Sequence, residues 1–287
     1  MHDTAGKFIV YSSPESQWAN VPLLGLVEKG YAPDDYEIKD LSLSTAENFD
    51  PKYLKINPNG TIPSIVAPKL SQPLTDSTDI LKFLDNSRPE GPPLVVDSCD
   101  RAVMQKLLDL VHSDKVHTNL ILLQARNAEE MKAKQNSSFK DFINARQQKL
   151  EEHGAANPQH PFYGPKARDN GTIHKLYNSD IGPEHEEFFM HSDHAFSEFA
   201  DGMNELEATL VLPYAAGDQV TLADLHIVPW LSHAMWGSGA TAIDDFGPLE
   251  RLIQVSVPDF KIGPKTKEWW ANMNKRESFK KVFPKLH

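Results

Sequence analysis

The first ninety residues alternate between short apolar runs and segments with apolar residues at helical spacing. Residues 7–12 are rich in strand-forming side chains, and a Ser-Pro turn closes the run. Residues 16–29 carry Val21, Leu24 and Val27 at helical spacing, and Gly30 suits a helix C-terminus. The same reasoning predicts, in order, a strand at 36–38, a helix at 51–56, strands at 62–66 and 72–75, and a helix at 77–86. This order predicts one compact α/β unit over residues 1–90.

Beyond residue 99 the chain carries almost no strand signal. Proline and glycine concentrate just after residue 87, so residues 91–99 are predicted to form a linker. Residues 100–287 are predicted to be all-helical, with one long helix marked by apolar residues from Phe189 to Leu210. Frequent glycine, proline, asparagine and histidine at 153–183 predict an irregular insertion near 127–185. The expected fold class is α/β plus all-α, a small mixed unit followed by a helical bundle.

Composition narrows the classes of protein that this organisation permits. The chain has 287 residues, a formal net charge of −11 and 40% hydrophobic residues, which is typical of a globular protein. The acidic balance argues against nucleic acid or an anionic membrane as a partner. Cys99 is the only cysteine, which excludes an internal disulfide framework and a thiolate zinc site. No signal peptide and no bilayer-spanning run is recognised, so a cytoplasmic location is expected.

Histidines are frequent between residues 153 and 194, and Glu187, His191 and His194 could share a helical face. The tract has no HExxH motif, so we expect no metal and interpret these side chains as solvated or pocket-lining. His226 is interpreted as a hydrogen-bonded core residue rather than a catalyst.

The densest local signal is the segment 57–66, which reads NPNGTIPSIV. Its Asn-Gly step and flanking prolines predict a tight turn, and Pro63 then opens a strand, because proline cannot donate to a sheet ladder. A cis Ile62–Pro63 bond would aim the Ile62 backbone N–H and C=O at a ligand. The simpler interpretation is that Pro63 only begins an edge strand.

A second signal follows at residues 74–80, LTDSTDI. Ser77 is predicted to be the N-cap of the next helix, whose free N–H groups suit a ligand carboxylate. Asp76 beside it can accept an ammonium group. Together the two features match the α-amino acid end of a ligand, although an ordinary helix cap also explains them.

These segments resemble the glutathione S-transferase superfamily. The resemblance rests on YSSPES at 11–16, the Asn-Pro-x-Gly-x-Ile-Pro turn, the pair Asp76-Ser77, and VTLADL at 220–225. In the last of these, Thr221 and Asp224 would form a capping box at a buried helix start. The resemblance covers most of the chain outside about 127–185. It implies an N-terminal thioredoxin-like domain that binds glutathione, a C-terminal helical domain with a second-substrate pocket, and a homodimer.

The resemblance also implies the site residues. Counting fourteen positions back from Gly30 places the catalytic residue at Ser16, with Ser13 and Ser12 as alternatives in the same turn. A serine hydroxyl at a helix N-terminus would favour the glutathione thiolate over the thiol. The implied glutathione contacts are Asn48, Thr61, Ile62, Pro63, Asp76 and Ser77. The implied second-substrate pocket comprises Met104, Leu108, His112 and Trp236.

The expected function is a serine-type glutathione transferase that attacks a hydrophobic electrophile, with glutathione as co-substrate. Ether cleavage, isomerisation and dehalogenation would use the same thiolate and remain alternatives. A glutathione- or ligand-binding protein without turnover is the alternative from another class.

Overall fold

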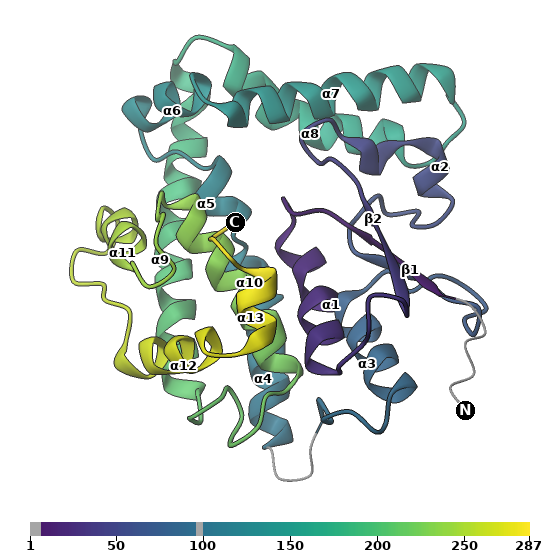
Figure 1. Ribbon diagram of the computed structural model, residues 1–287. Coiled ribbons are helices and arrows are strands. Elements are labelled where there is room, and N and C mark those ends of the chain that lie inside the picture. The colour runs from purple at the N-terminus through teal and green to yellow at the C-terminus, as the bar shows by residue number, and fades with distance from the viewer. Residues whose placement is uncertain (1–6, 96–99) are drawn as a thin grey trace.

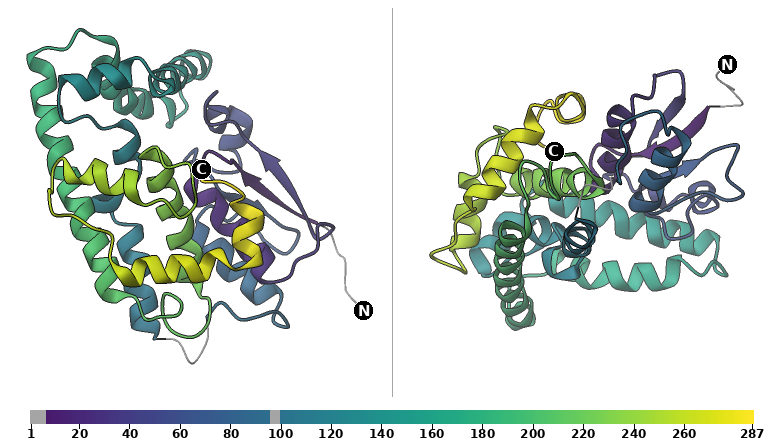
Figure 2. Two further views of the ribbon diagram at one scale, coloured as in Figure 1. Left: turned by 60° about the vertical axis from the view of Figure 1, so that its left-hand side comes forward. Right: turned by 90° about the horizontal axis from the view of Figure 1, so that it is seen from below.

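The structure is a computed structural model that describes residues 7–95 and 100–287. A small sheet with its helices lies beside a larger group of helices (Figures 1 and 2). The first unit contains β1 (Phe8–Ser12), α1 (Gln17–Glu28), β2 (Tyr36–Asp40), α2 (Pro51–Leu54), β3 (Ser64–Val66) and α3 (Ser77–Ser87). The second contains α4 (Arg101–Val111), α5 (Asn119–Leu123), α6 (Ala128–Gln135), α7 (Ser138–Ala156), α8 (Tyr163–Asn178), α9 (Glu186–Thr209), α10 (Leu222–Gly237), α11 (Gly247–Gln254), α12 (Pro264–Asn274) and α13 (Glu277–Val282). The expected fold class, thioredoxin-like α/β followed by helices, is confirmed.

The sheet has the strand order β2-β1-β3, in which β1 is parallel to β2 and antiparallel to β3. Val10 at its centre pairs with Ile38 on one side and Ile65 on the other. The strand predicted at 72–75 is wrong, since only a single bridge joins Leu74 to Ile65. Pro73 has no N–H to donate, which limits the ladder at this point.

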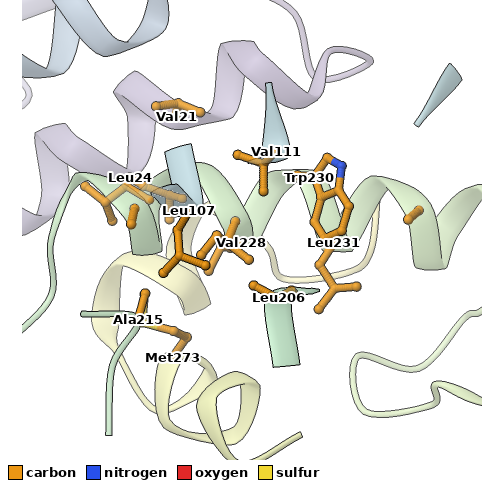
Figure 3. Packing of buried hydrophobic residues seen from close by; sticks show 14 of the residues in the cluster. Val21, Leu24, Leu107, Val111, Leu206, Ala215, Val228, Trp230, Leu231 and Met273 are labelled. Carbon is orange, nitrogen blue, oxygen red and sulfur yellow. The ribbon is translucent and has the colours of Figure 1, made fainter. Parts of the chain in front are cut away.

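The two units share a continuous apolar core. Helix α1 lies between the sheet and helices α10 and α13 (Figures 1 and 2). Val21 and Leu24 of α1 are fully buried together with Leu107 of α4 and Val228 of α10, as Figure 3 shows. The helical faces that the sequence marks as apolar are therefore the faces by which the units pack on each other.

The segment 127–185 is helical, so the expectation of an irregular insertion is wrong. Helices α7 and α8 form an antiparallel hairpin at the top of Figure 1, with α6 beside it. Gly164 and Pro165 lie in the first turn of α8, where backbone N–H groups have no intrahelical acceptor, so neither interrupts the helix. Asn170 in the middle of α8 donates its side-chain amide to Gln147 Oε1 at 2.9 Å and stabilises the hairpin.

The α7–α8 hairpin crosses over the N-terminal unit and packs on it beside α2 (Figure 1). The Tyr163 hydroxyl donates to the backbone oxygen of Phe49 at 2.9 Å, and both side chains are buried.

Within the described ranges, no helix combines the length and apolar content that a bilayer crossing requires. Cys99 and the last four residues of the predicted linker, 96–99, lie outside the described residues.

Candidate functional site

A cavity of about 650 Å³ lies between the two units and beneath the α7–α8 hairpin. One wall comes from the thioredoxin-like unit: the start of α1, the segment before α2, and residues 59–62. The other wall comes from α5, α7, α8 and the end of α10. The cavity therefore joins the loops predicted to bind glutathione to helices of the second unit.

The start of α1 places Ser16 at this cavity. Ser16 is the N-cap of α1, and its hydroxyl oxygen accepts the N–H of Ala19 at 3.3 Å. A hydroxyl that accepts in this way keeps its own proton free to donate. The alternatives Ser13 and Ser12 are buried beneath the turn and do not line the cavity. Of the three serines, only Ser16 combines a helix N-terminus with access to the cavity.

The turn at 57–62 faces the same space. The Ile62–Pro63 bond is cis, and Ile62 lines the cavity. No hydrogen bond within the described ranges occupies the Ile62 backbone N–H or C=O. Thr61 also lines the cavity, while its backbone oxygen accepts the Tyr53 hydroxyl at 2.6 Å. The turn thus presents one free backbone donor and one free acceptor.

Asn48 stabilises this turn through its side-chain nitrogen, and its side-chain oxygen is unpaired. Its side-chain amide donates to the backbone oxygen of Gly60 at 2.6 Å. Its Oδ1 is buried at the cavity without a partner among the described residues. A buried carbonyl oxygen without a donor is costly, and a ligand N–H would satisfy it.

The prediction that Ser77 caps α3 is wrong, because Asp76 is the N-cap. One Asp76 carboxylate oxygen accepts the N–H groups of Thr78 and Asp79 at 2.9 and 3.0 Å. A carboxylate with two backbone donors is a stronger cap than a hydroxyl with one. Ser77 is instead buried in the first turn, where its hydroxyl bonds the His226 ring at 3.2 Å. Neither Asp76 nor Ser77 lines the cavity.

His226 links α10 to the start of α3. Its Nδ1 donates to the backbone oxygen of Leu222 at 2.8 Å, so Nε2 accepts from the hydroxyls of Ser77 and Thr78. Burial lowers the pKa of the His226 ring to about 3, which keeps it neutral. His226 is therefore a buried histidine with both ring nitrogens occupied.

Three of the four side chains predicted for the second-substrate pocket lie elsewhere. Met104 and Leu108 are buried in the core shared by the units, and His112 stacks on Trp18 at 4.4 Å between ring centroids. Trp236, at the end of α10, does line the cavity. The apolar face of α4 is used for packing between the units.

The insertion contributes an apolar wall to the cavity, which the sequence analysis did not predict. Its side chains are Phe139, Phe142 and Ile143 of α7 and Ile173 of α8, and Leu122 and Leu123 of α5 add to them. The spacing 139-142-143-146 is a helical face. It could have been recognised, had the surrounding glycine and proline not favoured a loop.

A buried polar chain lies next to Ser16. The Thr118 hydroxyl donates to Gln17 Oε1 and bonds Nδ1 of His233 at 2.8 Å. Burial lowers the pKa of His233 to about 4, so its ring is neutral at pH 7. Since the Thr118 proton is directed to Gln17, the His233 proton lies on Nδ1 and is donated to the Thr118 oxygen.

Among residues 7–95 and 100–287, no three His, Cys, Asp or Glu side chains form a group that could hold a metal.

Gly60 sets how closely the hairpin approaches the turn. It has φ +61°, and a Cβ there would lie 2.7 Å from the Phe162 ring. We expect Gly60→Ala to lower the free energy of unfolding by at least about 2 kcal/mol. The left-handed backbone accounts for about 1–2 kcal/mol of this loss, and the clash with the Phe162 ring accounts for the rest. Urea unfolding of Gly60→Ala, Phe162→Ala and the double variant measures both parts. The double variant should recover the clash part, and strictly additive losses would contradict a contact between these residues.

The comparisons with known proteins agree with this arrangement. Residues 10–93 match the family described as glutathione S-transferase, N-terminal domain. Glutathione S-transferase Z1 of Arabidopsis thaliana is 34% identical over 119 residues, which are 41% of this chain and 52% of that protein. The chain thus spans about half the length of this curated relative. A thioredoxin-like unit joined to a helical unit, with a cavity between them, is the two-domain architecture that this chain shares with solved glutathione transferases. Residues 10–93 belong to this glutathione S-transferase N-terminal family.

Solved structures extend the likeness of fold to nearly the whole chain. The β-etherase LigF from a Sphingobium species has a TM-score of 0.62 and 22% identity, covering 97% of this chain and 99% of that one. Maleylacetoacetate isomerase from Methylobacterium extorquens, with bound malonate and glutathione, has a TM-score of 0.58 and 20% identity, covering 96% of both chains. At these identities the likeness concerns the fold.

Proposed function

We propose that this protein is a glutathione-dependent enzyme in which Ser16 stabilises the glutathione thiolate for attack on an apolar electrophile. The observation that carries the proposal is the placement of the Ser16 hydroxyl at the start of α1 and at the mouth of an apolar-walled cavity. The hydroxyl proton and the helix dipole both favour a negative sulfur over a neutral thiol. Such an arrangement raises the fraction of glutathione that can react.

The residues around the cavity fit glutathione as a ligand. The free N–H and C=O of Ile62 can pair with the backbone of its cysteine, and the unpaired Oδ1 of Asn48 can accept an N–H. Asp76 and Ser77 are proposed for its γ-glutamyl end. Because Asp76 already accepts the N–H groups of Thr78 and Asp79, the Ser77 N–H is the backbone donor proposed for the carboxylate.

The proposed reaction begins with loss of the thiol proton to solvent. The sulfur then attacks an electrophilic carbon held against the apolar wall, and Ser16 keeps its hydrogen bond to the sulfur until the carbon–sulfur bond forms. In conjugation, the leaving group departs with the electron pair of its own bond. We also propose, from the family resemblance, that the protein is a homodimer, which analytical ultracentrifugation tests.

A second candidate function is isomerisation, which the fold of the maleylacetoacetate isomerase neighbour supports. There the thiolate would add to a double bond and leave again after rotation, so glutathione is regenerated. Conjugation consumes one thiol for each product formed. Titration of free thiol during turnover therefore separates the two. Ether cleavage and dehalogenation also form a thioether, so each should consume one thiol for each product, as conjugation does.

The test of the proposal is the thiol pKa of bound glutathione, followed by ultraviolet absorbance of the thiolate. A hydrogen bond to a charged group contributes about 1.5–3 kcal/mol, which corresponds to about one to two pKa units. We expect Ser16→Ala to raise the bound thiol pKa by that amount and to lower kcat/KM about 10- to 100-fold.

Ser13→Ala is the matched control, because Ser13 lies in the same turn but does not line the cavity. It should leave the thiol pKa unchanged. A wild-type thiol pKa equal to that of free glutathione would contradict the enzyme proposal and favour a binding protein. A wild-type shift that survives in Ser16→Ala would transfer the role to Ser13 or Ser12.

A further inference from the structure

The wall of the cavity formed by α7 contains one cation, Arg146, which lies over two aromatic rings. The guanidinium carbon lies 4.4 Å from the centroid of the Phe49 ring and 5.1 Å from that of Phe142. Both rings line the cavity with it, and they come from different units of the fold. Contact with two aromatic rings restricts the side chain and displaces water from around the guanidinium.

Arg146 has no ion pair and no hydrogen bond with any of the residues that the structure describes. Burial lowers its pKa to about 10, and no nearby carboxylate offsets this effect, so the group stays charged at pH 7 with its donors unused. The other charged groups at the cavity are Lys166, Asp169 and Glu15. The Glu15 carboxylate already accepts the N–H of Ser44 at 2.8 Å.

A partly buried guanidinium without an anion is costly to maintain. Every other arginine that is not exposed in the described ranges has a carboxylate: Arg126 bonds Glu130 at 2.6 Å, Arg88 bonds Asp35 at 3.1 Å and Arg276 bonds Glu28 at 2.6 Å. Arg146 differs from them in lying at a cavity. The missing anion is therefore expected from a ligand that enters this space.

We propose that Arg146 is a carboxylate-binding site and that the carboxylate belongs to the second substrate. The substrate class is then an electrophile with an apolar, flat body and one carboxylate, which the guanidinium binds through two parallel N–H donors. The inference rests on the proposed function, since it names the co-substrate of the same cavity. Glutathione also has a glycyl carboxylate, so the experiment must separate the two sources.

The position of Arg146 favours the second substrate. It belongs to the helix whose Phe139, Phe142 and Ile143 form the apolar wall, whereas the free backbone groups of Ile62 belong to the opposite wall. An aromatic body packed on this wall would have its carboxylate at the guanidinium. Its electrophilic carbon would then be directed towards the wall that carries Ser16.

The experiment compares two probes, an activated chloronitrobenzoate and the neutral carboxamide of the same ring. In both, the sulfur–carbon bond forms, the carbon–chlorine bond breaks and chloride leaves with its electron pair. We expect Arg146→Gln to lower kcat/KM for the benzoate about 10- to 100-fold, with the carboxamide changed by less than about threefold. The KM for glutathione should stay constant.

Arg146→Lys keeps the charge but not the planar, two-donor guanidinium. Its kcat/KM for the benzoate should lie between those of wild type and Arg146→Gln, and its kcat/KM for the carboxamide should match that of wild type. Arg168→Gln on α8 is the matched control, because Arg168 is exposed and does not line the cavity. Circular dichroism of each variant confirms that it is folded. If Arg146→Gln does not fold, the benzoate selectivity of Arg146→Lys decides instead.

Equal losses on both probes would overturn the inference, and so would a raised KM for glutathione with unchanged probe selectivity, which would assign Arg146 to the glycyl carboxylate. If wild type turns over neither probe, the proposed function fails on its own. Calorimetric binding of the two preformed thioether conjugates then tests Arg146 without turnover. Tighter binding of the carboxylate conjugate, lost in Arg146→Gln, supports the site, and equal affinities refute it.

Discussion

Replacement of Asp224 by alanine is expected to lower the free energy of unfolding by roughly 3–5 kcal/mol. One carboxylate oxygen accepts the Ala215 N–H and the Trp269 indole N–H, both at 2.8 Å. The other accepts the Thr221 N–H at 2.8 Å and the Thr221 hydroxyl at 3.1 Å. The residue is fully buried, so alanine would leave several donors unpaired in a site that water does not reach.

The loss should extend beyond the start of α10, because Asp224 joins α10 to α12 through Trp269 and to the loop that contains Ala215. Denaturation by urea, followed by fluorescence and by circular dichroism, measures it. Asp79→Ala provides the comparison, since Asp79 is an exposed acid near the start of α3 and should change stability by less than about 1 kcal/mol. A similar small change in Asp224→Ala would show that the four hydrogen bonds contribute little.

The N-terminal unit could be predicted closely from its sequence, because each element there carries its own signal. Leu24 and its neighbours mark α1, Gly30 follows its end with a φ of +68°, and of the two interpretations open for Pro63 the structure has the cis bond. Local signals did not decide which of two adjacent polar residues caps α3. Asp76 accepts two backbone N–H groups there, while the Ser77 hydroxyl is engaged by His226, 149 residues away in the sequence.

The insertion could not be predicted in the same way, since its helices depend on contacts between distant segments. Gly171 in the middle of α8 reduces its local helical preference. The helix forms against α7, where Asn170 donates to Gln147, and against the first unit, where Tyr163 donates to Phe49. Composition describes the local cost of such a helix and omits the packing that offsets it.

The candidate site also combines residues that the sequence predicts with one that only the tertiary structure shows. Ser16, Thr61, Ile62 and Asn48 meet at one cavity, as the family resemblance implies. Arg146 has no counterpart in the motifs that carry the resemblance, because it lies in the segment that the resemblance does not cover. Its significance arises only where α7 crosses Phe49, and this crossing is a tertiary contact.

Acid is expected to destabilise the protein steeply below about pH 6.5, because two buried histidines stay neutral in the folded state. Burial lowers the pKa of His226 to about 3 and that of His233 to about 4. In the unfolded chain both take the ordinary value of about 6.5. Their stabilising effect is therefore complete above about pH 6.5 and is lost as the pH falls towards the folded-state pKa values, since only the unfolded state then binds the two protons.

Each proton contributes about 1.4 kcal/mol per pH unit, so the pair accounts for about 4 kcal/mol between pH 7.5 and pH 5. Burial also lowers the pKa values of His112, His117 and His287, which adds to the same trend.

Urea unfolding at several pH values between 7.5 and 5 measures this slope. His226→Gln and His233→Gln should each be less stable than wild type at pH 7.5, because a neutral hydrogen-bonding ring is lost. Each should also reduce the slope by about 1.4 kcal/mol per pH unit, since one fewer group titrates on unfolding. His174→Gln is the matched control, as His174 lies on α8 outside the buried set and should leave the slope unchanged. A double variant, His226→Gln with His233→Gln, that keeps the wild-type slope would show that acid unfolds the protein through other groups. A slope that is reduced only by His233→Gln would assign the acid sensitivity to the polar chain beside Ser16, and loss of glutathione binding should then follow the same pH profile.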